Sequence, residues 1–120
     1  MKHVFIINPV AGTGKVQDNL EKTIHLELAD RESDYEIYIT KFKGDIENFI
    51  ANKCKENVQT VFYACGGDGT LHEVINAAYK YDNASVGVIP LGSGNDFIKN
   101  FNNYENLTTL LCKQKADLLN

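Results

Sequence analysis

The feature that most limits the fold of this chain is a regular alternation of short apolar segments with amphipathic ones. Residues 2–8, 35–40, 60–65 and 85–89 are expected to be strands, and the first and third contain apolar runs without alternation, as strands buried on both faces do. Each strand is followed by a segment of helical periodicity. Such a chain folds into a parallel sheet with helices on both faces. We therefore predict a three-layer α/β domain.

Three amphipathic segments separate the expected strands, and each carries an apolar stripe at helical spacing. The stripes are Val16, Leu20, Ile24 and Leu28 in the helix expected over residues 15–30, then Ile46, Phe49, Ile50 and Cys54, and then Leu71, Val74, Ile75 and Ala78. We expect Asp45 to be the N-cap of the second helix. Thr70 is expected to cap the third, with Glu73 completing a capping box. Weaker signals after residue 95 indicate short helices and the beginning of another strand.

Composition narrows the class of protein. The chain has 120 residues, a hydrophobic fraction of 43% and a formal net charge of -4, which fit one ordinary domain and give no basic field for nucleic acid. The apolar runs are strand-sized, far short of the roughly 20 residues that a transmembrane helix needs. No signal peptide fits the first residues. The three cysteines are widely spaced, which argues against zinc and favours reduced, mostly buried thiols in a cytoplasmic protein.

Three glycine-containing loops, residues 8–15, 66–70 and 91–96, each follow an expected strand. In a parallel sheet all three would lie at the carboxyl edge, where open α/β folds bind ligands. Glycine lets backbone N–H groups approach an anion, and the helices that begin after such loops add partial positive charge. One glycine loop is usually only a turn, but three at one edge favour a site for a phosphate chain.

The familiar phosphate-binding fingerprints do not fit these loops. Gly14 and Lys15 match the end of a P-loop, but Pro9 stands where its first glycine should be and Val16 replaces the hydroxyl residue. The third glycine of a dinucleotide fingerprint is also missing. We therefore expect a phosphate-binding α/β domain of neither common type.

Three polar residues of the second and third glycine loops can be interpreted in chemical terms. Asp68, between glycines, has a structural interpretation as an Asx-turn or cap and a functional one as a contact to metal-bound nucleotide or a proton acceptor. Asp96 is more simply a residue at a helix N-terminus. Asn95 can both donate and accept hydrogen bonds at a ribose or phosphate.

The motifs resemble those of a known group. Residues 66–74 (GGDGTLHEV) resemble the GGDGT motif of diacylglycerol kinases, sphingosine kinases, NAD kinases and phosphofructokinases. Residues 8–15 (NPVAGTGK) resemble the NPxxG loop of the lipid kinases, and residues 90–97 (PLGSGNDF) resemble their PxGTxND segment. Together the segments span nearly the whole chain. It resembles the Rossmann-like, nucleotide-binding N-terminal half of the diacylglycerol kinase family.

This resemblance implies ATP and Mg²⁺ as cofactors, and transfer of the γ-phosphoryl of ATP to a lipid hydroxyl such as that of diacylglycerol at the membrane surface. It implies Asp68 as the catalytic candidate within this chain, and it assigns no metal-ligating residue. His72 departs from the Asn common at its position, which leaves its role open. The residues expected to contact nucleotide are Asn8, Pro9, Val10, Ala11, Gly12, Thr40, Gly66, Gly67, Asp68, Gly69, Thr70, Leu71, His72, Glu73, Gly92, Ser93 and Asn95.

The family fold has a second, β-rich domain that carries the expected general base. We interpret residues 1–115 as the nucleotide-binding α/β domain and residues 116–120 as the start of that second domain, which is absent from this chain. The fragment alone is expected to bind nucleotide weakly and to transfer phosphate poorly. Two alternatives are an NAD kinase-like enzyme and a non-catalytic nucleotide-binding module. The acceptor lipid, peripheral membrane association, a homodimer and the strand order stay open, although the alternating second strand hints at a sheet edge.

Overall fold

The computed structural model describes residues 1–9, 14–28 and 34–89. Its elements in chain order are β1 (Lys2–Ile7), α1 (Gly14–Leu28), β2 (Asp34–Ile39), α2 (Asp45–Cys54), β3 (Thr60–Cys65), α3 (Asp68–Ala78) and β4 (Ala84–Ile89). The strands form a four-stranded parallel sheet in the order β2-β1-β3-β4. This confirms the predicted α/β fold, and β2 is the outer strand on one side, as its alternation indicated. The elements expected after residue 95 lie outside the described residues.

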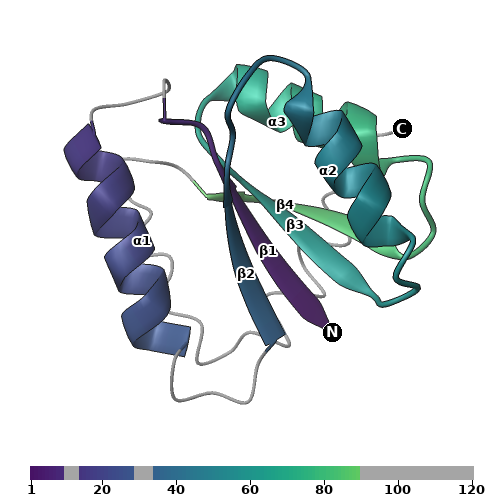
Figure 1. Cartoon of the computed structure of the whole chain (residues 1–120), viewed down its shortest axis with the longest axis horizontal. Coiled ribbons are helices and arrows are strands. Elements are labelled where there is room, and N and C mark those ends of the chain that lie inside the picture. The colour runs from purple at the N-terminus through teal and green to yellow at the C-terminus, as the bar shows by residue number, and fades with distance from the viewer. Residues whose placement is uncertain (10–13, 29–33, 90–120) are drawn as a thin grey trace.

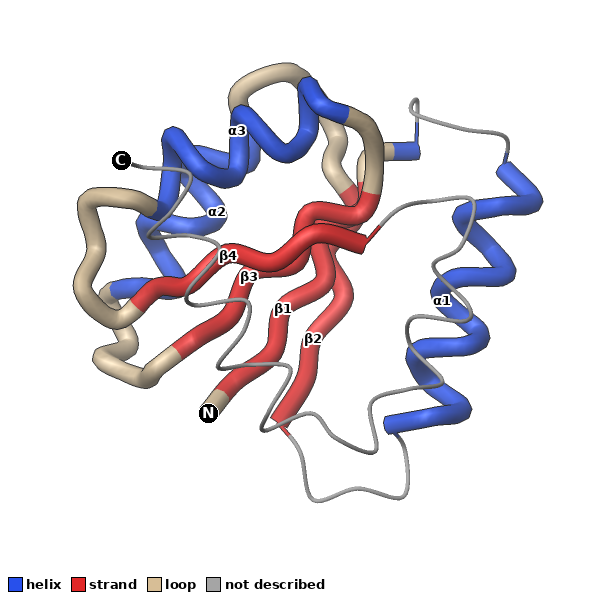
Figure 2. Tube along the Cα trace, turned by 180° about the vertical axis from the view of Figure 1, so that it is seen from behind, coloured by secondary structure: helices blue, strands red, loops and turns tan. Residues whose placement is uncertain are grey.

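Helices cover both faces of the sheet, with α1 on one face and α2 and α3 on the other (Figure 1). Successive residues of a strand point to opposite faces. In β1, Val4 and Ile6 therefore pack toward α2 and α3, whereas Phe5 and Ile7 pack toward α1. All four are fully buried. The view from behind shows the same three layers, with the central strands enclosed between them (Figure 2).

The apolar stripes of the three helices form the two cores largely as predicted. Residues from all three stripes are buried, namely Leu20, Ile24 and Leu28 of α1, Ile46, Ile50 and Cys54 of α2, and Val74 and Ala78 of α3. Ala77 joins the α3 face, while Phe49, Leu71 and Ile75 are only partly buried. Phe49 stacks on Tyr38 of β2 with ring centroids 3.9 Å apart. The side chain of Val16 lies outside the described part of the molecule.

The predicted helix caps are wrong for both α2 and α3. The N-caps are Gly44 and Gly67, and neither helix has a side-chain cap hydrogen bond. Gly44 has φ 93°, in the left-handed region that residues with a Cβ rarely adopt, so the chain reverses there and Asp45 becomes the first helical residue. Helix α3 begins two residues before Thr70, which places Thr70 in its first turn with its side chain buried.

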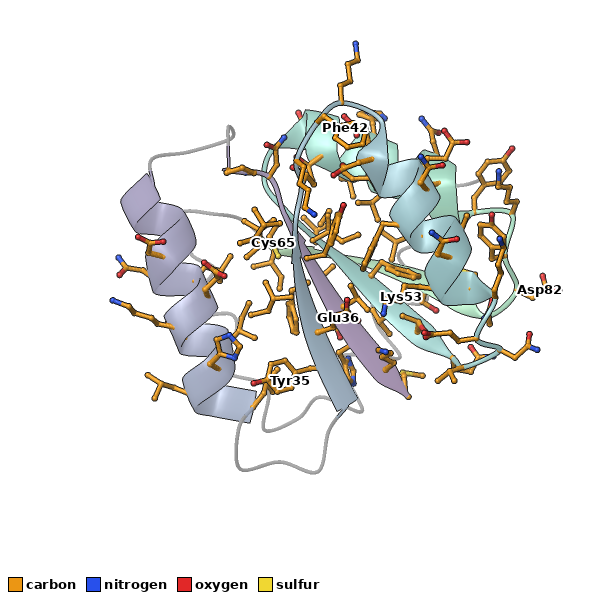
Figure 3. The ribbon with its side chains drawn as sticks, viewed as in Figure 1. Tyr35, Glu36, Phe42, Lys53, Cys65 and Asp82 are labelled. Atoms are coloured by element: carbon orange, nitrogen blue, oxygen red, sulfur yellow. The ribbon has the colours of Figure 1, made fainter. Side chains whose placement is uncertain are left out.

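The amino end of the sheet is held by a network of four charged residues. Lys2 lies 3.7 Å from both Glu36 and Glu56, and Lys53 pairs with the same two carboxylates. Glu36 and Lys53 of this network are labelled in Figure 3. The hydrogen bond to Glu36 raises the pKa of Lys53, and nearby negative charge adds to this against the opposing effect of burial. The network joins the first two strands to the C-terminal end of α2.

The predicted burial of the cysteines is confirmed for two of the three. Cys54 and Cys65 are buried thiols outside any disulfide, and complete burial raises the pKa of Cys65 because the thiolate would lose its hydration. Cys112 lies outside the described residues. Within the described ranges, no helix has both the length and the apolar character needed to cross a membrane.

Candidate functional site at the carboxyl edge of the sheet

The carboxyl ends of the strands meet in register at one edge of the sheet. Ile7, the last residue of β1, aligns with Ile39 of β2 and with Cys65 of β3. The chain leaves β1 toward β2 on one side, while β3 lies on the other side, so the strand order reverses at β1. Open α/β sheets bind ligands in the crevice outside such a reversal. The loops that follow β1, β2 and β3 begin at this edge (Figure 1).

Thr70 connects two loops at the crevice, because it accepts a hydrogen bond from Asn8 and packs closely against Gly66. The Asn8 side-chain amide donates to Thr70 Oγ1 at 3.4 Å, which connects the end of β1 to the first turn of α3. Thr70 is 3% exposed. A Cβ added at Gly66 would stand 2.8 Å from Thr70 Oγ1, closer than packed atoms allow. Glycine at position 66 is therefore required by packing within the protein.

Gly67 and Gly69 differ from Gly66 in this respect. A Cβ added at either would meet nothing within 4 Å, and Gly67 has an extended backbone (φ −90°, ψ −167°) that any residue can adopt. Both glycines are exposed, as is Asp68 between them. The first amide groups of a helix have no acceptor within it, and no side chain caps α3. This turn therefore presents uncovered N–H groups, with the positive end of the helix dipole, to the solvent.

A cavity of about 270 Å³ lies beside this turn, at the ends of β1 and β2. Asn8 and Pro9 line it from β1, Thr40 lines it from the end of β2, and Glu73 lines it from α3. The rest of its wall comes from Lys41, Phe42, Lys43 and Ile46. Lys43 and Glu73 also line an adjoining cavity of about 290 Å³, which continues between α2 and α3. The edge therefore offers a recess flanked by two lysines next to the uncapped helix.

The cavity wall between β2 and α2 is anchored by Asp45. Its Oδ2 accepts hydrogen bonds from the Lys41 backbone N–H at 2.7 Å and from the Tyr38 hydroxyl at 2.8 Å. Burial raises the pKa of Tyr38, and the hydrogen bond and negative charge of Asp45 raise it further. Tyr38 therefore stays a neutral donor to this carboxylate at physiological pH.

The residues that the sequence predicted fall into three groups. Asn8, Pro9, Thr40 and Glu73 meet at the cavity, and Gly66 to Thr70 lie beside it through the contact between Asn8 and Thr70. Two predicted residues stand apart, since His72 is exposed on α3 and Leu71 packs against the core shared by α2 and α3. The others lie outside the described residues, namely Val10, Ala11, Gly12, Gly92, Ser93 and Asn95.

Sequence reasoning missed most of the loop after β2. Lys41, Phe42 and Lys43 line the cavity, and Phe42 is 64% exposed, an unusual state for a phenylalanine. A lysine–phenylalanine–lysine run directly after a strand, at the edge where the glycine loops gather, was a usable signal. The run contains no glycine, so the pattern of glycine loops does not mark it.

The described residues of the site do not form a cluster of metal ligands. No group of three or more His, Cys, Asp or Glu side chains in the described residues is placed to hold a metal ion. Asp68 is the one carboxylate within the glycine turn, and it is exposed. The arrangement consists of backbone donors, two lysines and two exposed carboxylates, Asp68 in the glycine turn and Glu73 on the cavity wall. The backbone donors and lysines suit a polyanionic ligand.

Known proteins with similar sequences point the same way. The diacylglycerol kinase catalytic domain family matches residues 2–118. The chain is 38% identical over 87 residues to a probable lipid kinase YegS-like of Klebsiella pneumoniae (strain 342), covering 72% of this chain and 29% of that protein. It is 40% identical over 94 residues to the diacylglycerol kinase of Staphylococcus saprophyticus, covering 77% and 30%.

A third relative is the putative lipid kinase YtlR of Bacillus subtilis (strain 168), which is 33% identical over 101 residues, covering 81% of this chain and 32% of the relative. The matches thus span about three tenths of the length of these relatives. The family match covers nearly the whole chain, including the three glycine-containing loops of the sequence, residues 8–15, 66–70 and 91–96. The chain belongs to the diacylglycerol kinase catalytic domain family, a family of lipid kinases.

Proposed function

We propose that this chain is the nucleotide-binding part of an ATP-dependent lipid kinase, which transfers the γ-phosphoryl of ATP to a lipid hydroxyl such as that of diacylglycerol. The observation that carries the proposal is the pair Gly67 and Gly69. Neither the folded backbone nor the packing around them requires glycine. Gly69 also lies within α3, where glycine costs up to about 0.8–1.0 kcal/mol relative to alanine. A close ligand explains why no Cβ stands there.

The chemistry asks the protein mainly to position the phosphates and to stabilise their charge. The amide groups at the start of α3 would bind phosphate oxygens, and Lys41 and Lys43 would add positive charge from across the cavity. Asn8 and Thr70 would hold the glycine turn against the end of β1. The alkoxide-forming step needs a base for the lipid hydroxyl, which we place in the part of the relatives' length that this chain does not span.

The described residues fit a magnesium ion that arrives with the nucleotide. Magnesium in proteins usually binds through one or two carboxylates together with substrate phosphates and water. Asp68, exposed in the middle of the glycine turn, would hold it. When bound, the ion neutralises charge on the phosphates. The remaining work in this chain is done by backbone amides, Asn8, Thr70 and the two lysines.

Calorimetric titration with Mg·ATP tests the proposal on the chain and on Gly69→Ala. Because alanine favours the helix, this variant is expected to unfold at higher temperature while binding nucleotide at least tenfold more weakly. Asn52→Ala is the matched control, since it changes an exposed residue near the C-terminal end of α2, a different helix from the one that contains Gly69. It should gain stability similarly and bind as the wild type does. Unchanged affinity in Gly69→Ala would remove the main support for a phosphate site.

The acceptor class needs a second assay. Transfer of label from [γ-³²P]ATP is measured with diacylglycerol in mixed micelles and with NAD in separate reactions, on a protein that spans the full length of the relatives, because this chain alone is expected to transfer phosphate poorly. Label in the lipid supports the proposal, and label in NAD overturns it in favour of an NAD kinase. Nucleotide binding without transfer to either acceptor would favour a non-catalytic nucleotide-binding module.

A further inference from the structure

The loop between β2 and α2, residues 40–44, forms one wall of the cavity yet has little packing to hold it. Its first four residues line the cavity. Lys41, Phe42 and Lys43 are all exposed, and Phe42 is 64% exposed. A loop with so few buried contacts samples many conformations unless hydrogen bonds fix it. What fixes this loop therefore determines the shape of the cavity.

Three described hydrogen bonds hold the loop. The Thr40 N–H donates to the Ile7 carbonyl at 3.0 Å and so extends the pairing of β2 with β1. The Asp45 N–H donates to the Phe42 carbonyl at 3.3 Å. Between these two, the Lys41 N–H donates to Asp45 Oδ2 at 2.7 Å, the shortest of the three and the one made by a side chain.

Asp45 occupies an unusual place for a carboxylate. It is 4% exposed, and its second oxygen, Oδ1, is buried with no hydrogen-bond partner among the described residues. Burying a carboxylate oxygen without a partner is unfavourable. The left-handed Gly44 turns the chain so that the Asp45 side chain reaches back to Lys41. A residue chosen only for packing would not be charged here.

We propose that Asp45 is a positioning residue whose carboxylate fixes the Lys41 amide, and through it the Thr40–Lys43 wall, in the shape that receives the nucleotide. The inference rests on the proposed function. Without this bond the Lys41 N–H would turn to water, and the nucleotide would have to order the loop when it binds. The cost of that ordering appears as lost affinity.

The experiment compares Asp45→Ala, Asp45→Asn and Tyr38→Phe. Asn keeps an oxygen that can accept the Lys41 N–H, whereas Ala keeps none. Tyr38→Phe removes the other donor to Oδ2 and leaves the loop bond intact. Two quantities are measured on each protein: the Kd of Mg·ATP by calorimetry, and the hydrogen-exchange rate of the Lys41 amide by NMR.

We expect Asp45→Ala to exchange the Lys41 amide faster and to raise the Kd about tenfold. Asp45→Asn and Tyr38→Phe should stay within about threefold of the wild-type Kd. Aspartate in the first turn of a helix also stabilises it through its charge. If that were the whole role of Asp45, Asn would lose affinity as Ala does, which would overturn the proposal.

The remaining outcomes separate this inference from the proposed function. Fast exchange in Asp45→Ala with an unchanged Kd would overturn the positioning role alone. A wild-type chain that does not bind Mg·ATP would overturn both. If Asp45→Ala does not fold, Tyr38→Phe still decides, because a tenfold weaker affinity in a variant that retains the Lys41 bond contradicts the proposal.

Discussion

At the amino end of the sheet, Lys2 and Lys53 are paired with Glu36 and Glu56, whereas at the carboxyl end none of the described charged side chains forms an ion pair. The difference is not one of composition, because Lys41, Lys43, Asp68 and Glu73 gather around the carboxyl edge. At the amino end the charges satisfy one another. At the other end these side chains form no ion pairs with other described residues, so they are available to the proposed ligand.

The glycines of residues 66–69 also differ in what requires them. Gly66 is glycine because Thr70 leaves no room for a Cβ, whereas Gly67 and Gly69 have open space around them. Adjacent residues of one motif are therefore constrained for different reasons. Gly66 belongs to the folded structure, and its neighbours belong to the proposed ligand site.

Gly66→Ala is the substitution with the largest expected effect. Unchanged stability would contradict the distinction between Gly66 and its neighbours. The new Cβ has to displace Thr70, which breaks the contact with Asn8 and is expected to cost about 1–3 kcal/mol of unfolding free energy. Urea denaturation measures this cost. Nucleotide affinity should fall as well. A variant as stable as the wild type would show that the Asn8–Thr70 contact adapts at no cost.

Glu36→Gln tests the amino end with an effect of intermediate size. It removes the carboxylate that both Lys2 and Lys53 contact. Because these side chains are partly exposed, the loss of stability should be only about 0.5 kcal/mol, and it should shrink as salt is added. The affinity for Mg·ATP should not change. A variant that binds nucleotide as weakly as Gly66→Ala would show that the two ends are coupled.

The smallest expected effect is a loss of stability at alkaline pH. Tyr38 near the carboxyl edge of the sheet and Lys53 near its amino end both contribute to it. The pKa of Tyr38 lies above its ordinary value of 10.0 and that of Lys53 above 10.5, so the folded protein holds both protons more tightly than the unfolded chain does. The stabilisation is complete below these ordinary values and is lost as the pH rises through the raised ones.

Urea midpoints measured across that alkaline range separate the two contributions. Tyr38→Phe removes the titrating group at the carboxyl end, and Glu36→Gln removes the main cause of the raised pKa of Lys53 at the amino end. Each variant should lose less stability between neutral and alkaline pH than the wild type. Identical pH profiles in all three proteins would contradict the assignment.

Periodicity located the elements of this fold well because buried strands and helices have strong local signals. The apolar run of β3 and three residues of the α1 stripe, Leu20, Ile24 and Leu28, correspond directly to buried positions. The order of the strands could not be derived in this way, because pairing between β1 and β3 joins segments that are far apart in the chain. The predicted caps failed because Asp45 and Thr70 fit the local pattern, while the backbone turns at the preceding glycines.

The sequence predicted those residues of the candidate site that belong to a motif. It did not predict those whose role depends on tertiary contacts. Asn8 and the residues of the glycine turn came from the resemblance to lipid kinases. Phe42 and Asp45 carry no such mark, since their importance depends on a loop that folds back across the end of β2. That contact is visible only when the strand, the turn and the helix are in place.

The central position of β1 has a consequence for how the chain acquires its structure during synthesis. Strand β1 precedes both of its neighbours in the chain and is paired on both sides in the finished sheet, with Lys2 opposite Asp34 on one side and Thr60 on the other. Its apolar residues therefore have no complete partner until β3 has emerged. Pairing over such long stretches of chain is slow. The centre of the sheet therefore cannot close until residues 60–65 have been synthesised, and its formation is expected to be slower than that of the helices.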